Sequence, residues 1–104
     1  MQRVAFKMKL KKGCEEEYKK RHDALWPELK KLLKENRINE YSIFLDKETS
    51  ILFAYLTIEN EKILDELPHY PVMKHWWFYM RDIMETNDDN SPLSIPLTEV
   101  FYMP

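Results

Sequence analysis

The chain has 104 residues, of which 44% are hydrophobic, 13% aromatic and 33% charged. This composition predicts one soluble globular domain over residues 1–104 and excludes a disordered chain, because the apolar surface offsets the entropy of ordering. Sixteen basic and eighteen acidic residues give a net charge of −2, which argues against nucleic acid as the main partner, since phosphate binding needs a positive field.

The sequence also argues against a membrane protein or a secreted one. No apolar stretch approaches the ~20 residues that a membrane-spanning helix needs, and the first ten residues alternate in polarity where a signal peptide would have an apolar block. Cys14 is the only cysteine, so neither an intramolecular disulfide nor a thiolate zinc site is predicted. We therefore expect a cytoplasmic protein with no membrane partner.

The first third of the chain predicts a strand followed by a long helix. Apolar and polar residues alternate from Val4 to Leu10, which is typical of a half-buried strand, and the only glycine, Gly13, ends it. A helix is predicted from about Cys14 to Asn36, with acidic residues in its first turn as the helix dipole favours. Pro27 should kink this helix, because proline lacks the backbone N–H that an inner helical turn uses.

The rest of the chain predicts three strands and two further helices. Strands at about Asn39–Asp46 and Ile51–Ile58 form a hairpin, since the segment between them is short and polar. A short helix is expected from about Glu61 to Leu67, and a longer one from Pro71 to Met84, because proline suits a first helical turn. After a polar loop, the last strand is predicted at about Leu97–Met103.

The order of these elements predicts an α+β sandwich of the ferredoxin-like βαββαβ type. In that architecture both helices cover the same face of the sheet. The strand Ile51–Ile58 is apolar on both faces, with Phe53 and Tyr55 pointing away from the helices. An apolar sheet face of this extent usually marks an interface, so we expect a homodimer that packs sheet face against sheet face.

Tyr18 and His22 lie one turn apart in the first predicted helix. Steps of three and four residues place them on the side of the helix that carries its leucines and faces the sheet. His22 is either a core histidine hydrogen-bonded to the backbone, since buried histidines are common, or part of a cavity, which two adjacent inward polar groups favour. An imidazole titrates near neutral pH, so His22 is the candidate acid–base group.

Trp76 and Trp77 are the candidate walls of such a cavity. Adjacent residues differ by about 100° around a helix, so at most one of the two points straight into the core. Tryptophan faces suit the C–H surface of a sugar, and the indole N–H can donate to a hydroxyl. Tyr41, at the start of the second strand, either supplies another hydroxyl or is an ordinary half-buried strand tyrosine.

Other familiar sites are absent from the sequence. His69 and His75 are six residues apart and have no third ligand at metal spacing, so no metal site is predicted. A single glycine excludes most phosphate loops and dinucleotide-binding motifs. The residues alone thus predict a small dimeric α+β domain with an aromatic cavity, without naming a substrate.

A collinear set of short runs extends over nearly the whole chain. The runs are Tyr18…Arg21-His22, Leu25-Trp26-Pro27-Glu28-Leu29, Tyr41-Ser42-Ile43, Leu45-Asp46, Trp76-Trp77, Tyr79-Met80, Asp82-Ile83-Met84, Asp89-Asn90-Ser91-Pro92 and Glu99-Val100-Phe101-Tyr102. In this order they resemble the L-rhamnose mutarotase family. Phe78 and Asp88 depart from the lysine and the proline that the family pattern leads us to expect there, and neither replaces a matched site residue.

The resemblance implies a dimeric α/β-barrel protein that interconverts the α and β anomers of L-rhamnose in the cytoplasm. It implies that His22 is the proton donor and that Tyr18, Tyr41, Trp76 and Trp77 contact the sugar. Opening and reclosing a hemiacetal ring involves no redox step and no phosphoryl transfer, so neither cofactor nor metal is expected.

Two other interpretations stay open at this point. A small-ligand-binding or monooxygenase-type protein of the same dimeric barrel architecture would predict a bound coloured cofactor or oxygen uptake. An RNA-recognition module has the same element order and would stack bases on Phe53 and Tyr55, but the net charge and the lack of a basic stripe argue against it.

Overall fold

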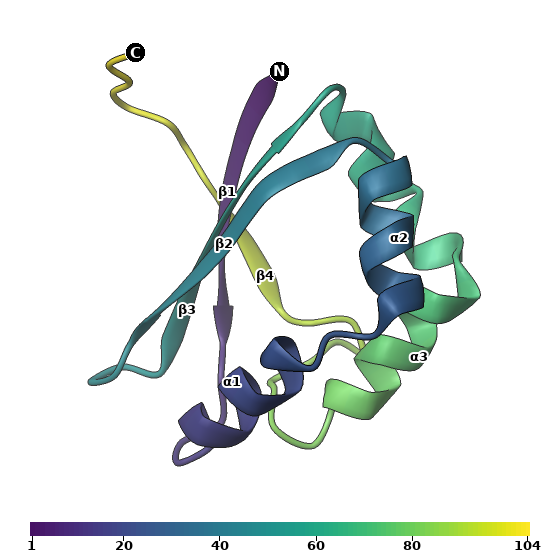
Figure 1. The fold of residues 1–104 in the computed structure, drawn as a ribbon. Coiled ribbons are helices and arrows are strands. Elements are labelled where there is room, and N and C mark those ends of the chain that lie inside the picture. Colours follow the sequence, from purple (N-terminus) through teal and green to yellow (C-terminus); the bar gives the residue numbers. More distant parts are fainter.

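Four antiparallel strands form one sheet in the order β2-β3-β1-β4 in the computed structural model, which describes residues 1–104. The strands are β1 (Gln2–Lys9), β2 (Ile38–Asp46), β3 (Ile51–Ile58) and β4 (Ser94–Leu97). Three helices, α1 (Glu15–Asp23), α2 (Pro27–Glu35) and α3 (Pro71–Met80), lie on one side of the sheet, and its other side is bare (Figure 1). The sheet thus has its helices on one face only, as predicted.

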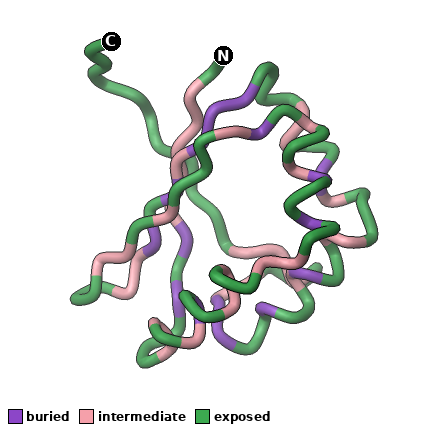
Figure 2. Tube along the Cα trace, in the orientation of Figure 1, coloured by how far each residue is buried: buried purple, intermediate pink, exposed green.

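β3 is apolar on both of its faces, as predicted. All eight residues of β3 pair with β1, so it is a central strand. Leu52, Ala54 and Leu56 are buried on the face that carries the helices, whereas Phe53 is 40% exposed on the bare face. Figure 2 shows the buried residues on the strands and helices that enclose the interior, with the C-terminal segment exposed throughout. The core therefore lies between one sheet face and the helices.

The single kinked helix predicted from Cys14 to Asn36 is wrong, because two helices occupy this segment. α1 ends at Asp23 and α2 begins at Pro27. Trp26 is extended, with φ −59° and ψ 131°, as expected for a residue that precedes proline. Proline fits the first turn of a helix, where its missing N–H costs nothing, so Pro27 starts α2 and leaves α1 as a separate short helix.

β2 contains a bulge that includes a candidate site residue. The strand begins one residue earlier than predicted, and its register with β3 shifts between Asn39 and Ser42. Glu40 lies in the left-handed region with φ 51°. A bulge adds one residue to a strand and re-aims the side chains beside it. Here Glu40 and Tyr41 together lie opposite Leu56, so Tyr41 is one of the two residues of the bulge.

The helix predicted from Glu61 to Leu67 consists of two short 3₁₀ helices, Glu61–Asp65 and Leu67–His69. The Asn60 side-chain oxygen accepts a hydrogen bond of 3.0 Å from the backbone N–H of Lys62 and so caps the first of them. The tight i→i+3 pattern suits short connecting segments of this kind.

α3 begins at Pro71 as predicted but ends at Met80, four residues before the predicted end at Met84. The backbone of Met84 pairs with Leu10 beyond the end of β1, so this segment returns to the sheet and leaves the helix. None of the helices has the length and apolar character needed to cross a membrane.

The last strand was predicted at Leu97–Met103 and lies instead at Ser94–Leu97, with the following residues exposed and outside the sheet. Side chains hold this tail in place of a backbone ladder. The Arg3 guanidinium lies 2.7 Å from a carboxylate oxygen of Glu99 and 3.4 Å from the ring centre of Tyr102. The residues after Leu97 that were predicted as a strand therefore lie outside the sheet.

Candidate active site

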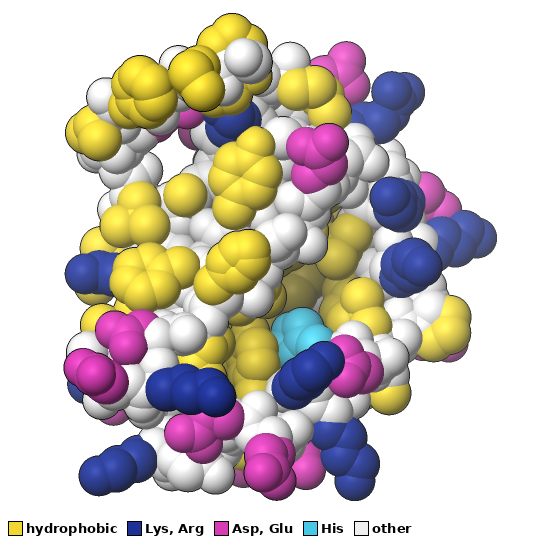
Figure 3. Space-filling view, turned by 60° about the vertical axis from the view of Figure 1, so that its left-hand side comes forward, with side chains coloured by type: hydrophobic (Ala, Val, Ile, Leu, Met, Phe, Trp, Pro, Cys, Tyr) yellow, Lys and Arg dark blue, Asp and Glu magenta, His cyan; other side chains and the backbone are white.

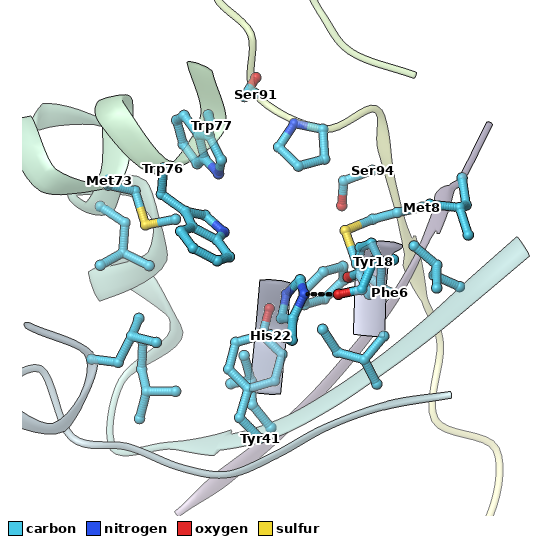
Figure 4. A pocket seen from close by; sticks show the side chains of 18 of the residues that line it. Phe6, Met8, Tyr18, His22, Tyr41, Met73, Trp76, Trp77, Ser91 and Ser94 are labelled. Carbon is cyan, nitrogen blue, oxygen red and sulfur yellow. Dashed lines mark hydrogen bonds between the residues drawn. The ribbon is translucent and has the colours of Figure 1, made fainter. Parts of the chain in front are cut away.

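An open cavity of about 1560 Å³ lies between the sheet and the helices. All five residues predicted for the site line it: Tyr18 and His22 from α1, Tyr41 from β2, and Trp76 and Trp77 from α3. Figure 4 shows these side chains around one space. The fold thus brings together residues that are up to 59 positions apart in the sequence.

His22 lines the cavity and is also hydrogen-bonded to the backbone, so the two interpretations of this residue are compatible. Its Nδ1 lies 3.0 Å from the carbonyl oxygen of Tyr18, one turn earlier in α1. A carbonyl oxygen only accepts hydrogen bonds, so Nδ1 carries the proton and donates it. Nε2 is then the unprotonated nitrogen of the neutral ring, and no protein group bonds to it.

Burial lowers the pKa of His22 below its usual value, although the Tyr18 carbonyl and the Asp23 carboxylate oppose this effect. The imidazole is therefore mainly neutral near pH 7, with Nε2 able to accept a proton. Its ring stacks on the Tyr18 ring at 4.2 Å between centres and meets the Trp76 ring edge-on at 5.4 Å. These contacts fix the plane of the imidazole.

Two uncharged phenols flank the imidazole. Burial raises the pKa of Tyr18, with a further contribution from Tyr41, and burial raises the pKa of Tyr41 to about 12. Although 41% of Tyr41 is exposed, its hydroxyl end points into the cavity below His22 (Figure 4). No polar side-chain atom that is fully buried lacks a partner. The Tyr18 hydroxyl, which bonds to no protein group, is thus open to the cavity, and the raised pKa values mean that both phenols keep a proton to donate.

Trp76 and Trp77 form the opposite wall of the cavity. Trp76 is only 5% exposed and packs edge-on against Trp26, with 5.1 Å between ring centres. Trp77 is half-buried. As predicted, only one of the two tryptophans is a core residue. This residue, Trp76, is buried in the core and also lines the cavity. Both indole nitrogens lie on the cavity side of their rings (Figure 4).

Sequence reasoning missed the loop that lines the cavity between α3 and β4. Asn87, Ser91 and Ser94 contribute polar groups there. The Asn87 side-chain amide donates to the Ser91 hydroxyl at 3.0 Å, and that hydroxyl and the Ser91 backbone N–H donate to the Asp89 carboxylate, which lowers the pKa of Asp89. The signal was present in the turn-forming residues Asn87–Pro92, which were predicted as a polar loop and include the matched run Asp89-Asn90-Ser91-Pro92, but were given no part in the site.

Charges of both signs surround the entrance. Figure 3 shows a histidine in a hollow with apolar walls, bordered by basic and acidic side chains. The acidic and basic residues that line the cavity are Glu15, Glu16, Lys19, Lys20, Asp23, Lys47, Glu61, Lys62 and Asp65. Such a mixed rim suits an uncharged ligand. No group of three or more His, Cys, Asp or Glu side chains is placed to hold a metal ion.

Comparison with known proteins identifies the family. The family model described as L-rhamnose mutarotase matches residues 3–103. The chain belongs to the L-rhamnose mutarotase family. The L-rhamnose mutarotase of Formosa agariphila is 56% identical over 103 residues, and that of Bacteroides thetaiotaomicron is 57% identical over 103 residues, each match covering 99% of both chains.

The fold agrees with this L-rhamnose mutarotase assignment. A crystal structure of L-rhamnose mutarotase from Formosa agariphila superposes with a TM-score of 0.94 at 55% identity, over the whole of both chains. The predicted fold class, a ferredoxin-like α+β sandwich of the dimeric α/β-barrel kind, is confirmed by this match. The resemblance that the short sequence runs indicated is confirmed as well.

Proposed function

We propose that this protein interconverts the α and β anomers of L-rhamnose, acting as a homodimer in the cytoplasm. One observation carries the activity. In a chain of this family, a neutral histidine with an unpartnered Nε2 faces the same cavity as two phenols that keep their protons and two indole rings. These groups suit proton transfer on a sugar ring and need no cofactor.

In the proposed reaction, Nε2 of His22 takes the proton of the anomeric hydroxyl. The C1–O5 bond then breaks as the C1–O1 double bond forms, and the imidazolium returns the proton to O5. Rotation about C1–C2 and the reverse steps close the ring with the other configuration. The histidine ends as it began, and a positioned acid–base group of this kind accelerates a reaction by typically about 10²–10⁴-fold.

The other four residues orient the sugar in this proposal. The hydroxyls of Tyr18 and Tyr41 donate hydrogen bonds to sugar oxygens, because both stay protonated at neutral pH. The indole rings of Trp76 and Trp77 cover the C–H face of the ring. The methyl group of a 6-deoxy sugar gains about 1 kcal/mol on burial against such apolar walls.

The test is NMR exchange spectroscopy of the anomeric protons over a panel of reducing sugars. We expect catalysed exchange of L-rhamnose above the buffer rate. L-mannose, which has a hydroxyl in place of hydrogen at C6, should exchange more slowly, because its C6 would place a polar group against an apolar wall. Absence of any enzyme-dependent exchange of L-rhamnose would reject the proposal.

The rate should depend on pH through the neutral form of His22. Because burial lowers the pKa of this imidazole, the neutral form persists to lower pH than in a free histidine. We expect exchange to be constant above neutrality and to fall on acidification, with a midpoint below the ordinary value of 6.5. The measurement is the enzyme-dependent exchange rate from pH 4.5 to 8, after subtraction of buffer catalysis. A rate that rises on acidification would contradict a neutral histidine base.

The proposed dimer interface is the bare face of the sheet. Paired positions place Phe44, Phe53, Lys7 and Ile95 in one row across the four strands. Three of these side chains are apolar, and Phe44 is 65% exposed. A second copy of the chain presents the same apolar row, so two copies can cover each other with one symmetric interface.

Phe53→Glu should dissociate this dimer, because it replaces an apolar side chain of a central strand with a carboxylate that the interface would bury. We expect wild type to sediment at twice 12.7 kDa at micromolar concentration and the variant at 12.7 kDa with lower thermal stability. Phe78→Glu is the matched control, since Phe78 is exposed on α3, away from the bare face. Wild type that sediments only at 12.7 kDa would refute the dimer.

A further inference from the structure

α1 carries two of the proposed site residues but is weakly held by apolar packing. Of its nine residues only Tyr18 is buried. The wall residues Trp76 and Trp77 belong to a different helix, α3. The distance between the acid–base group and the sugar-stacking wall therefore depends on whatever fixes α1 against α3.

Arg21, the neighbour of His22, makes polar contacts from α1 to the last turn of α3 and to Asp82 in the turn that follows α3. Its Nη1 donates to the carbonyl oxygen of Tyr79 at 2.8 Å and to Oδ1 of Asp82 at 2.9 Å, and its Nη2 donates to Oδ2 of Asp82 at 3.1 Å. Its Nε donates to Glu17 at 2.7 Å. The Arg21 side chain is only 10% exposed.

These contacts suit an arginine at the end of a helix. Tyr79 lies in the last turn of α3, where backbone carbonyls lack helical partners and carry partial negative charge. The two parallel bonds to the Asp82 carboxylate fix direction as well as distance, which a lysine ammonium does not do. The hydrogen bonds from Arg21 also keep the pKa of Asp82 below its usual value, so this carboxylate stays ionised.

A continuous series of side-chain contacts leads from Arg21 through Tyr79 and Trp76 back to His22. The Arg21 guanidinium lies 4.5 Å from the centre of the Tyr79 ring, and the Tyr79 and Trp76 rings are 5.6 Å apart. Trp76 in turn meets the His22 ring. Two neighbouring residues of α1 thus contact two residues that are one turn apart on α3, so a shift of Arg21 moves His22 relative to Trp76.

We propose that Arg21 is a positioning residue of this site: it fixes α1 to the C-terminal end of α3 and thereby holds His22 at the working distance from a sugar bound against Trp76. This inference rests on the proposed function. Misplacement of a catalytic group by about 1 Å costs as much as 10²-fold in rate. The effect therefore falls on the catalytic rate constant more than on sugar affinity.

The test compares Arg21→Gln with Arg37→Gln. Arg37 also pairs with a carboxylate, that of Glu59 at 3.7 Å, but this pair is exposed and does not line the cavity. For Arg21→Gln we expect kcat for anomer exchange to fall by about 10- to 100-fold with KM changed less than about threefold. Arg37→Gln should leave both constants unchanged.

Two conservative variants extend the comparison. Arg21→Lys keeps the charge but loses the paired bonds, so it should recover only part of the rate. Asp82→Asn, at an exposed side chain, should lower kcat in the same direction as Arg21→Gln and by less. Full activity per folded molecule in Arg21→Gln, even with a lowered melting temperature, would overturn the positioning role and leave a structural one.

A readout that does not use activity separates this inference from the proposed function. Nuclear Overhauser contacts between the His22 imidazole and the Trp76 indole should be present in wild type and in Arg37→Gln. They should weaken or disappear in Arg21→Gln. Unchanged contacts in Arg21→Gln would overturn the inference even if wild type were active, whereas a wild type that exchanges no sugar but whose contacts depend on Arg21 would reject the proposed function and not the geometric role of Arg21.

Discussion

His22→Asn should lower enzyme-catalysed anomer exchange at saturating L-rhamnose by about 10²-fold or more while the protein stays folded. Asparagine has no group that titrates near neutral pH, so no side chain remains at this position to shuttle the proton. The measurement is anomeric exchange and thermal unfolding on one preparation. Sugar affinity should change far less than the rate, since the contacts of Tyr18 and Trp77 are kept.

The fold of His22→Asn should survive because asparagine can replace the one hydrogen bond that the imidazole makes. At the C-terminal end of α2 the Asn36 side-chain amide donates to the carbonyl oxygen of Leu32, four residues earlier, at 2.9 Å. This is the same i to i−4 relation as that of His22 with the Tyr18 carbonyl. An intact exchange rate in a destabilised but folded variant would show that His22 is a core residue and not the acid–base group.

The first three strands were predictable from the period-two alternation of β1 and the short polar segment that joins β2 and β3, whereas the last strand was predicted three residues too late. β3 has its predicted bounds, and its two apolar faces were read directly from the positions of Leu52 and Phe53. The bounds of the helices were less predictable, because Pro27 fits either a kink inside a helix or the first turn of a new one. The packing of the preceding segment decides whether Pro27 kinks one helix or starts a second one, and this packing cannot be deduced from the local sequence.

The candidate site was predictable where its residues lie on one helix and less so elsewhere. Helical spacing alone paired Tyr18 with His22 and made Trp76 and Trp77 candidate cavity walls, and the resemblance to a family decided between the two interpretations of Tyr41. The contributions of Asn87 and Ser91 depend on how a loop folds back over the cavity. Such a return is a long-range contact that neither periodicity nor residue spacing predicts.

Trp76→Ala should destabilise the protein severely, because this side chain is both wall and core. Trp76 packs against His22, Trp26 and Tyr79. Truncation of a buried tryptophan costs about 3–5 kcal/mol, which is a large part of the stability of a small domain. We expect a large fall in the urea midpoint, and a midpoint close to that of wild type would contradict the core role of Trp76.

Trp77→Ala isolates the wall from the core, because Trp77 is half-buried and does not take part in the aromatic cluster around Trp76. Loss of one stacking surface costs about 0.5–1.5 kcal/mol, so the apparent dissociation constant for L-rhamnose should rise by up to about tenfold. Because His22 and its hydrogen bond to Tyr18 are untouched, the rate at saturation should fall much less. The measurements are sugar titration and exchange rates of both variants. We expect Trp77→Ala to lose mainly affinity and His22→Asn to lose mainly rate. If Trp77→Ala lost rate at unchanged affinity while His22→Asn lost affinity at unchanged rate, the acid–base group and the sugar platform would have to be exchanged.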